Sequence, residues 1–146
     1  MKITGSVLII IASVAVAFYY ENKQKNNLIM LTSVYNFLEF IKNQIEFFSL
    51  PLNLIYEKYQ PKNDCILSLI GGEVPKIFSQ NIQDKLADCF LQLGKGYKTE
   101  QIDKLNYTIS QIEKEINTMQ RENTKKIKIF RAISLFIGCS IVILLV

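Results

Sequence analysis

Apolar residues are concentrated at the two ends of the chain, whereas the stretch between them mixes apolar and polar positions. The segment Ile3–Tyr20 contains no charged residue. At a rise of about 1.5 Å per residue, a helix of this length spans about 27 Å, close to the thickness of the hydrocarbon core of a bilayer. The aromatic residues at its end are typical of a membrane–water boundary. The pattern predicts an N-terminal membrane-spanning helix.

The C-terminal segment Ala132–Val146 is also uncharged, although it is short for a membrane span. Arg131 can extend its aliphatic stem toward the headgroups, so that Ile127, Ile129 and Phe130 add to the apolar length. A helix buried in a protein core is the alternative, but little else in this small chain could cover so uniformly apolar a surface. We expect a second membrane-spanning helix here.

A cleaved signal peptide is the alternative for the N-terminal segment. Lys2 would supply a minimal basic region, and Ala15–Ala17 fits the small-residue pattern of a cleavage site. Lys23 and Lys25, directly after the apolar run, favour a retained helix whose far side stays in the cytoplasm.

Basic residues flank both apolar segments on the side that faces the middle of the chain. Since positive charge beside a span favours the cytoplasmic side, we expect a cytoplasmic middle and both termini across the membrane. The predicted organisation is an N-terminal transmembrane helix over 1–21, a cytoplasmic helical domain over 22–128 and a C-terminal transmembrane helix over 129–146. The flanking basic residues are Lys23, Lys25, Lys125, Lys126, Lys128 and Arg131.

Helical periodicity begins in the middle with Leu28–Phe48, which is either a separate helix or a continuation of the first span. Its apolar residues recur at three- and four-residue steps and so share one face. Ser49-Leu50-Pro51 is expected to end this helix and start another, with the serine as a cap and the proline in the first turn. The apolar positions are Leu28, Leu31, Val34, Tyr35, Leu38, Ile41, Ile45 and Phe48.

Three shorter helices follow, separated by proline and glycine. Pro61 is expected to break the first, Gly71-Gly72 and then Pro75 to end the second, and Gly94-Lys95-Gly96 to close the third. The positions that repeat at helical spacing in the third are Ile77, Phe78, Ile82, Leu86, Cys89, Phe90 and Leu93. The helices are Leu52–Tyr59, Cys65–Ile70 with Asp64 as its cap, and a longer one from Pro75 or Gln80 to Leu93.

The last helix is expected to run from about Thr99 into the second span. Its near-strict heptad seam favours packing inside its own domain, with self-association or a partner helix as the alternative. No stretch of the middle alternates like a strand. The predicted fold is all-α: a small helical bundle of about five helices flanked by the two transmembrane helices. The seam consists of Ile102, Leu105, Ile109, Ile112, Ile116 and Met119.

Charge and composition exclude several function classes. The net charge is +4, but residues 26–124 hold 10 basic against 12 acidic residues, which argues against nucleic-acid binding. The chain has no histidine, and Cys65, Cys89 and Cys139 lack a CxxC spacing. This argues against zinc sites, disulfide frameworks and histidine-dependent catalysis. We expect no enzyme activity, no cofactor, no metal and no small-molecule substrate.

Gly94-Lys95-Gly96 is not expected to bind phosphate. It lacks the GxxxxGK[ST] spacing and follows a helix rather than a strand, so a helix cap is the simpler interpretation.

Two motifs carry a family resemblance. Gln44-Ile45-Glu46-Phe47-Phe48-Ser49-Leu50-Pro51-Leu52 ends the amphipathic helix, and Leu93-Gly94 precedes Gln101 at the start of the last helix. With an apolar segment at either end, the order of features resembles the stage III sporulation protein AB family over nearly the whole chain. The family pattern reads approximately Glu-Ile-x-Tyr-x-x-Thr-Pro-Leu, and then Leu-Gly followed by an Asp and a Gln. The residues that match are Ile45, Pro51, Leu52, Leu93, Gly94 and Gln101.

The chain departs from that pattern at four positions, and its middle is shorter than in typical members. Gln44 stands where an acid is usual, and Phe47 replaces the tyrosine. Leu50 replaces the threonine, and Tyr97 replaces the aspartate.

The resemblance implies a component of the mother-cell-to-forespore channel of endospore formers, in the outer forespore membrane. Its cytoplasmic domain would be similar to those of type II secretion platform proteins, which dock a hexameric secretion-type ATPase. The implied partners are the membrane, that ATPase and other channel subunits of the same operon, and homo-oligomers stay open. The alternative is an unrelated two-span helical membrane protein that acts as a regulatory or sensor subunit.

Overall fold

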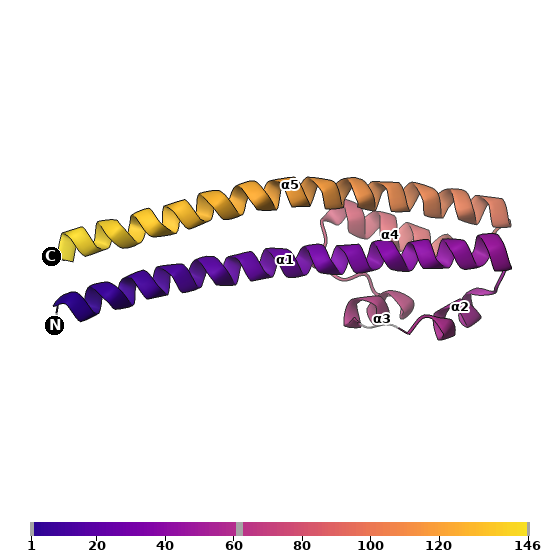
Figure 1. The fold of residues 1–146 in the computed structure, drawn as a ribbon. Coiled ribbons are helices and arrows are strands. Elements are labelled where there is room, and N and C mark those ends of the chain that lie inside the picture. Colours follow the sequence, from indigo (N-terminus) through magenta and orange to yellow (C-terminus); the bar gives the residue numbers. More distant parts are fainter. Residues whose placement is uncertain (1, 61–62, 146) are drawn as a thin grey trace. The chain divides into compact units, whose positions relative to one another are not determined.

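A computed structural model describes the chain over residues 2–60 and 63–145, and side chains at 2–4, 6, 142, 144 and 145 are outside that description. Within it the chain forms five α-helices and no strand, which confirms the all-α prediction (Figure 1). The helices are α1 (Lys2–Phe48), α2 (Leu52–Lys58), α3 (Asp64–Ile70), α4 (Gln80–Gln92) and α5 (Lys98–Leu145).

The chain divides into two compact units. One, here called the terminal unit, combines Met1–Asn26 with Thr118–Val146. The other, the helical domain, comprises Asn27–Asn117. Helices α1 and α5 each contribute to both units, because no break separates the apolar ends from the amphipathic stretches.

The helical domain is built on the antiparallel pair of α1 and α5. The short helices α2 and α3 pack on α1, where Lys58 contacts Gln44 and Asn63 contacts Ser33. Helix α4 contacts both long helices in this unit. Its Lys85 donates a hydrogen bond to Gln111 of α5, and its Phe90 ring stacks near the ring of Phe37 on α1.

Phe37 lies at the centre of the core, fully buried between three helices. Its ring centroid is 4.7 Å from that of Tyr59, 6.1 Å from Tyr56 and 6.3 Å from Phe90. Burying a side chain of this size stabilises the fold by roughly 1.5–3 kcal/mol before cavity effects are counted. The sequence pattern missed this residue. Core residues with less than 2% exposure include Leu31, Val34, Leu38, Ile41, Ile55, Leu86, Leu105 and Ile112.

The heptad seam of α5 packs as predicted at its centre. Leu105, Ile109 and Ile112 are buried within the chain itself, while the outer members of the seam are half-buried. Two residues of the predicted apolar faces are exposed: Ile77 is 49% exposed and Phe48 is 64% exposed. Ile77 precedes the first turn of α4, and Phe48 is the last residue of α1, so both lie at the ends of helices.

Local turn chemistry differs in detail from the predictions. Pro51 is the N-cap of α2 rather than a residue of its first turn. Ser49 does not cap α2. It closes α1 in the left-handed conformation, at φ 51°, and its amide donates to the Ile45 carbonyl at 3.2 Å, as in the αL motif.

Asp64 is likewise the first residue of α3, and Asn63 occupies the cap position. The Asn63 side chain donates to Ser33 Oγ at 2.9 Å instead of capping the helix. The predicted glycine stop of α3 is confirmed. Gly72, at φ 86°, donates to Leu69, and Glu73 donates to Ser68, the two bonds of a Schellman motif. The predicted break at Pro61 lies outside the described residues.

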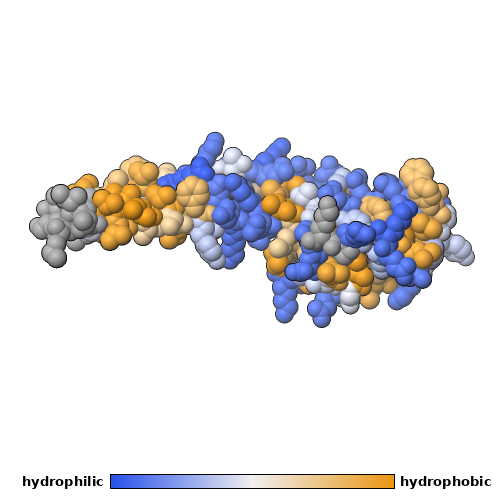
Figure 2. Space-filling view, turned by 60° about the horizontal axis from the view of Figure 1, so that its bottom comes forward, coloured by the Kyte–Doolittle hydropathy of each residue, from blue (hydrophilic) through white to orange (hydrophobic). Residues whose placement is uncertain are grey.

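In the terminal unit, α1 and α5 run side by side (Figure 1). Most of the described apolar side chains in this unit are exposed. Tyr20 and Phe130 stack at 4.7 Å between ring centroids. A Cβ at Gly138 would lie 2.9 Å from Ser13 Oγ, so the helices approach closely there. Figure 2 shows apolar residues gathered over these segments. Exposed examples are Leu8, Ile11, Val16, Phe18, Leu135, Phe136 and Ile143.

Within the part of the chain that the structure describes, no helix combines the length and apolar character needed to cross a membrane. The two predicted membrane-spanning helices are therefore not confirmed. Both reach into positions outside the described side chains, at 3, 4 and 6 and at 142 and 144–146.

Candidate functional site

Most residues of the two family motifs meet at one end of the helical domain. We call this the loop end and define it by residues 45–52, where α1 turns into α2, and 93–101, where α4 turns into α5. It lies opposite the end at which Asn27 and Asn117 bound the domain. Two loops more than 40 residues apart in the sequence therefore form one surface.

Gly94 lies close to the first loop. Its φ is +83°, a conformation that residues with a side chain rarely adopt. A Cβ at this position would lie 2.9 Å from Leu52 Cδ1, closer than packed carbon atoms tolerate. The glycine closes α4, as predicted, and it also lets Leu52 pack against the backbone of the second loop.

Gln101 holds the second loop in shape with both ends of its amide. Its Oε1 accepts a hydrogen bond from the Gly94 amide at 3.2 Å, and its Nε2 donates to the Gly96 carbonyl at 2.8 Å. A glutamine is suited to this position because it offers a donor and an acceptor on one side chain. The role of Gln101 is therefore to brace the loop from the first turns of α5.

A shallow groove of about 540 Å³ runs between the two loops. Lys98 lies beside it, and its Nζ donates to the Glu46 carbonyl at 2.7 Å and to Ser49 Oγ at 3.0 Å. Both acceptors are neutral, and no carboxylate in the described residues pairs with this ammonium. The groove is lined by Ile45, Ser49, Leu50, Pro51, Leu52, Gly94, Gly96, Lys98 and Gln101.

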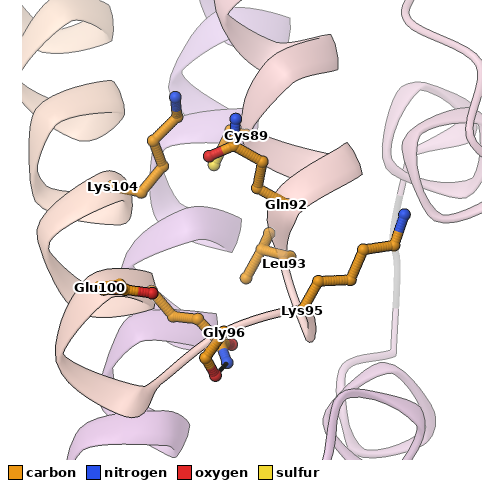
Figure 3. A pocket seen from close by; sticks show the side chains of 8 residues that line it. Cys89, Gln92, Leu93, Lys95, Gly96, Glu100 and Lys104 are labelled. Carbon is orange, nitrogen blue, oxygen red and sulfur yellow. Dashed lines mark hydrogen bonds between the residues drawn. The ribbon is translucent and has the colours of Figure 1, made fainter.

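A smaller cleft of about 150 Å³ opens on the α4 side of the same loop. In Figure 3, Lys104 of α5 points toward Cys89 and Gln92 of α4, and Glu100 points toward Gly96. Lys104 forms an ion pair with Asp88. Cys89 is fully buried, and burial raises the pKa of its thiol, which leaves it protonated and unreactive near neutral pH.

Aromatic side chains are exposed at the loop end. Phe47 is 72% exposed, Phe48 is 64% exposed and Tyr97 is 81% exposed. The bond from Lys98 to the Glu46 carbonyl brings the chain neighbours of these residues together. Figure 2 shows apolar residues at this end of the domain. Clustered exposed aromatic residues on a polar domain are typical of protein–protein contact surfaces.

Leu93 of the motif set lines the smaller cleft instead of the groove, and Gln44 lines neither. Gln44 is 92% buried and accepts a hydrogen bond from Lys58 of α2 at 3.3 Å. Lys58 also lies over the Phe48 ring at 5.4 Å. An acid at position 44 would face the same ammonium, so this position joins α1 to α2.

The basic residues that were predicted to flank the membrane lie in the terminal unit, whereas the motif residues lie in the helical domain. Lys25 and Arg131 both pair with Glu21, and Lys126 pairs with Glu122 at 2.7 Å. The remaining three, Lys23, Lys125 and Lys128, have exposed side chains.

Sequence reasoning missed two contributors to these sites. Lys98 bridges the loops, but a single exposed lysine at a helix start carries no sequence signal. Glu21 pairs with Arg131 across 110 residues, and the only signal was its position as the one acid beside an apolar run.

The described residues contain no cluster of three or more metal-ligating side chains. In the same residues, every buried side-chain nitrogen or oxygen has a hydrogen-bond partner. The loop end combines backbone groups, the ammonium groups of Lys95 and Lys98, and exposed aromatic rings, which suits binding to another protein.

Comparison with known proteins agrees with the motifs. The family model of stage III sporulation protein AB matches residues 2–90 and 76–146, which together cover nearly all of the chain. No curated protein and no solved structure matches it.

Proposed function

Because the chain belongs to the stage III sporulation protein AB family and so has a role in sporulation, we propose that it is a non-catalytic platform subunit. It would serve a secretion-like channel between mother cell and forespore, and its loop end would dock a secretion-type ATPase. The observation that carries this proposal is the convergence of Leu52, Gly94 and Gln101 on a surface with exposed aromatic rings.

The loop end suits docking because hydrogen bonds that do not involve its exposed aromatic rings hold its two loops in shape. Gln101 and Lys98 fix both loops through backbone acceptors, so little conformational entropy would be lost on binding. Phe47 and Tyr97 remain free to enter pockets on a partner, and large aromatic residues dominate the energetics of such contacts.

Membrane anchoring is the second part of the proposal. The terminal unit exposes apolar residues along both of its helices, such as Leu8, Val16 and Phe136, and basic residues follow at its inner boundary. We propose that both ends are anchored in the outer forespore membrane, with the helical domain in the cytoplasm and both termini outside it. Other channel subunits of the same operon would be further partners.

Docking is tested with the purified full chain in mild detergent and the ATPase encoded beside it. Replacing both exposed rings, Phe47→Ser with Tyr97→Ser, is expected to weaken binding at least about tenfold, since each such residue contributes more than about 1 kcal/mol at an interface. Tyr107→Ser is the matched control, because Tyr107 is 53% exposed on α5 but does not belong to the loop end. Equal binding by the double variant and the control would refute docking through the loop end.

Anchoring and orientation need a separate test in sporulating cells. The chain is expected to remain with the membrane after alkaline carbonate extraction. A reporter fused after Val146 that folds only outside the cytoplasm is expected to be active. Release by carbonate would refute anchoring, and an inactive reporter would refute the orientation. A wild-type chain that stays anchored without binding the ATPase would favour a regulatory or sensor subunit instead.

A further inference from the structure

Three charged residues form a cluster in the terminal unit. Glu21 accepts hydrogen bonds from Lys25 Nζ, at 2.8 Å, and from Arg131 Nη2. The Glu21 side chain is only 10% exposed, whereas those of Lys25 and Arg131 are 59% and 58% exposed. One carboxylate is thus shared by two cations, and the cluster keeps one net positive charge.

A groove of about 290 Å³ opens next to this cluster, between α1 and α5 of the same unit. Its walls are mostly hydrocarbon, from Val14, Ala17, Phe18 and Leu135, and Ser134 adds a hydroxyl. Arg131 is its one charged lining residue. The groove therefore has an apolar body and a cationic edge.

Arg131 has donors left after pairing with Glu21. A guanidinium carries five N–H groups and pairs well with a planar or tetrahedral anion. Lys128 lies three residues earlier on α5, so it shares the face of Arg131. Lys128 has no carboxylate within ion-pair distance among the described residues. Positive charge therefore exceeds negative charge at this edge of the groove.

We propose that this groove binds one anionic phospholipid of the bilayer, with its phosphate at Arg131 and an acyl chain along Val14, Phe18 and Leu135. The inference rests on the membrane anchoring proposed above. An amphiphile with an anionic head matches both the apolar walls and the uncompensated charge. A second copy of the chain fits less well, because its own basic residues would meet those of the first at the same depth.

Binding is tested on the full chain in mild detergent by native mass spectrometry, with phosphatidylglycerol and phosphatidylcholine of the same acyl chains. We expect one phosphatidylglycerol per chain, bound about fivefold more tightly than phosphatidylcholine, which corresponds to about 1 kcal/mol for a cation near a headgroup. Arg131→Gln should remove this preference. Val14→Trp should fill the groove and weaken the binding of both lipids.

Two matched controls separate the groove from general attraction. Lys125→Gln removes the same charge from the same flank without touching the groove, and Val16→Trp adds the same ring at a 58% exposed position outside it. Both controls should bind like the wild type. Circular dichroism melts of all four variants report whether each remains folded.

The proposal is overturned if Lys125→Gln lowers the lipid preference as much as Arg131→Gln while Val14→Trp has no effect, since that result indicates diffuse attraction. Dimers that dissociate on Val14→Trp would assign the groove to a second copy and also overturn it. Carbonate extraction keeps the two proposals apart. A chain retained in the membrane without lipid preference refutes only this site, whereas a released chain refutes the anchoring on which it rests.

Discussion

Helix α1 has one stretch in the terminal unit and another in the helical domain. Both stretches are rich in apolar residues, yet most of the buried ones lie in the helical domain. Val34, Phe37 and Leu38 in the helical domain have no exposed surface, whereas Leu8 is 66% exposed and Val16 is 58% exposed in the terminal unit. The difference lies in the number of partners. Helices α2, α3 and α4 cover α1 in the helical domain, whereas α5 alone faces it in the terminal unit.

Apolar content alone therefore does not decide which residues form a core. A pair of helices can bury only one stripe of each partner, and the remaining surface needs another apolar environment. The terminal unit has such a stripe at Ala17 and Gly138, and most of its other described apolar side chains are exposed.

Removing the ends is the most severe test of this comparison. The segment Asn22–Lys125 contains the whole helical domain, and it is expected to be soluble without detergent and strongly helical by circular dichroism. The full chain is expected to require detergent, because its exposed apolar surface would otherwise aggregate. A full chain that is equally soluble, or a segment that contains substantial strand, would break the comparison.

The next largest effect is expected from deleting one ring in each unit. Phe37→Ala should destabilise the chain by about 3–5 kcal/mol, because it leaves a cavity between Tyr59, Tyr56 and Phe90. Phe136→Ala should change the melting temperature little, since Phe136 is 73% exposed. Thermal melts in detergent measure both. Similar losses for the two variants would contradict the assignment of buried and exposed halves.

Replacing a glycine by alanine tests, in each unit, a place where the glycine lies close to another side chain. Gly94→Ala should cost about 1–3 kcal/mol, from a left-handed backbone and a clash with Leu52. Gly72→Ala isolates the backbone part, because Gly72 has φ +86° but open space around it. Gly138→Ala should be nearly neutral, since alanine favours the helix and only the hydroxyl of Ser13 must move. Melts that rank Gly138→Ala as the most damaging would reverse this interpretation.

The smallest effects concern two paired carboxylates in the terminal unit, Glu122 and Glu21. The hydrogen bond and charge of Lys126 lower the pKa of Glu122. The stabilisation from this pair is therefore present above the ordinary pKa of glutamate and is lost as the pH falls through the lowered value. Because both side chains are 55% exposed, Glu122→Gln should shift the melting temperature within error at any pH.

Glu21→Gln is the contrasting variant, since it leaves Lys25 and Arg131 near each other without their shared carboxylate. Its melting temperature at neutral pH should fall measurably more than that of Glu122→Gln. Equal melting temperatures for the two variants would show that the low exposure of Glu21 adds no stability to its ion pairs.

Much of the fold could be predicted because its signals are local. Pro51, Gly71, Gly72 and Gly94 end or begin helices through backbone preferences that depend on a few neighbouring residues. The periodicity of α5 indicated Leu105, Ile109 and Ile112 as its buried face for the same reason. Phe48 and Ile77 belong to the predicted apolar faces but are exposed. Both lie at helix ends, where periodicity does not show whether a neighbouring helix extends that far.

The sequence by itself determined that the chain is helical, that its turns lie near residues 50, 71 and 94, and that its ends differ from its middle. Tertiary structure alone decided which distant groups meet: Leu52 with Gly94, Gln101 with both sides of a loop, and Glu21 with Arg131. Backbone preferences act within about one helical turn. Contacts between helices depend on their rotation and register, which the packed core sets as a whole.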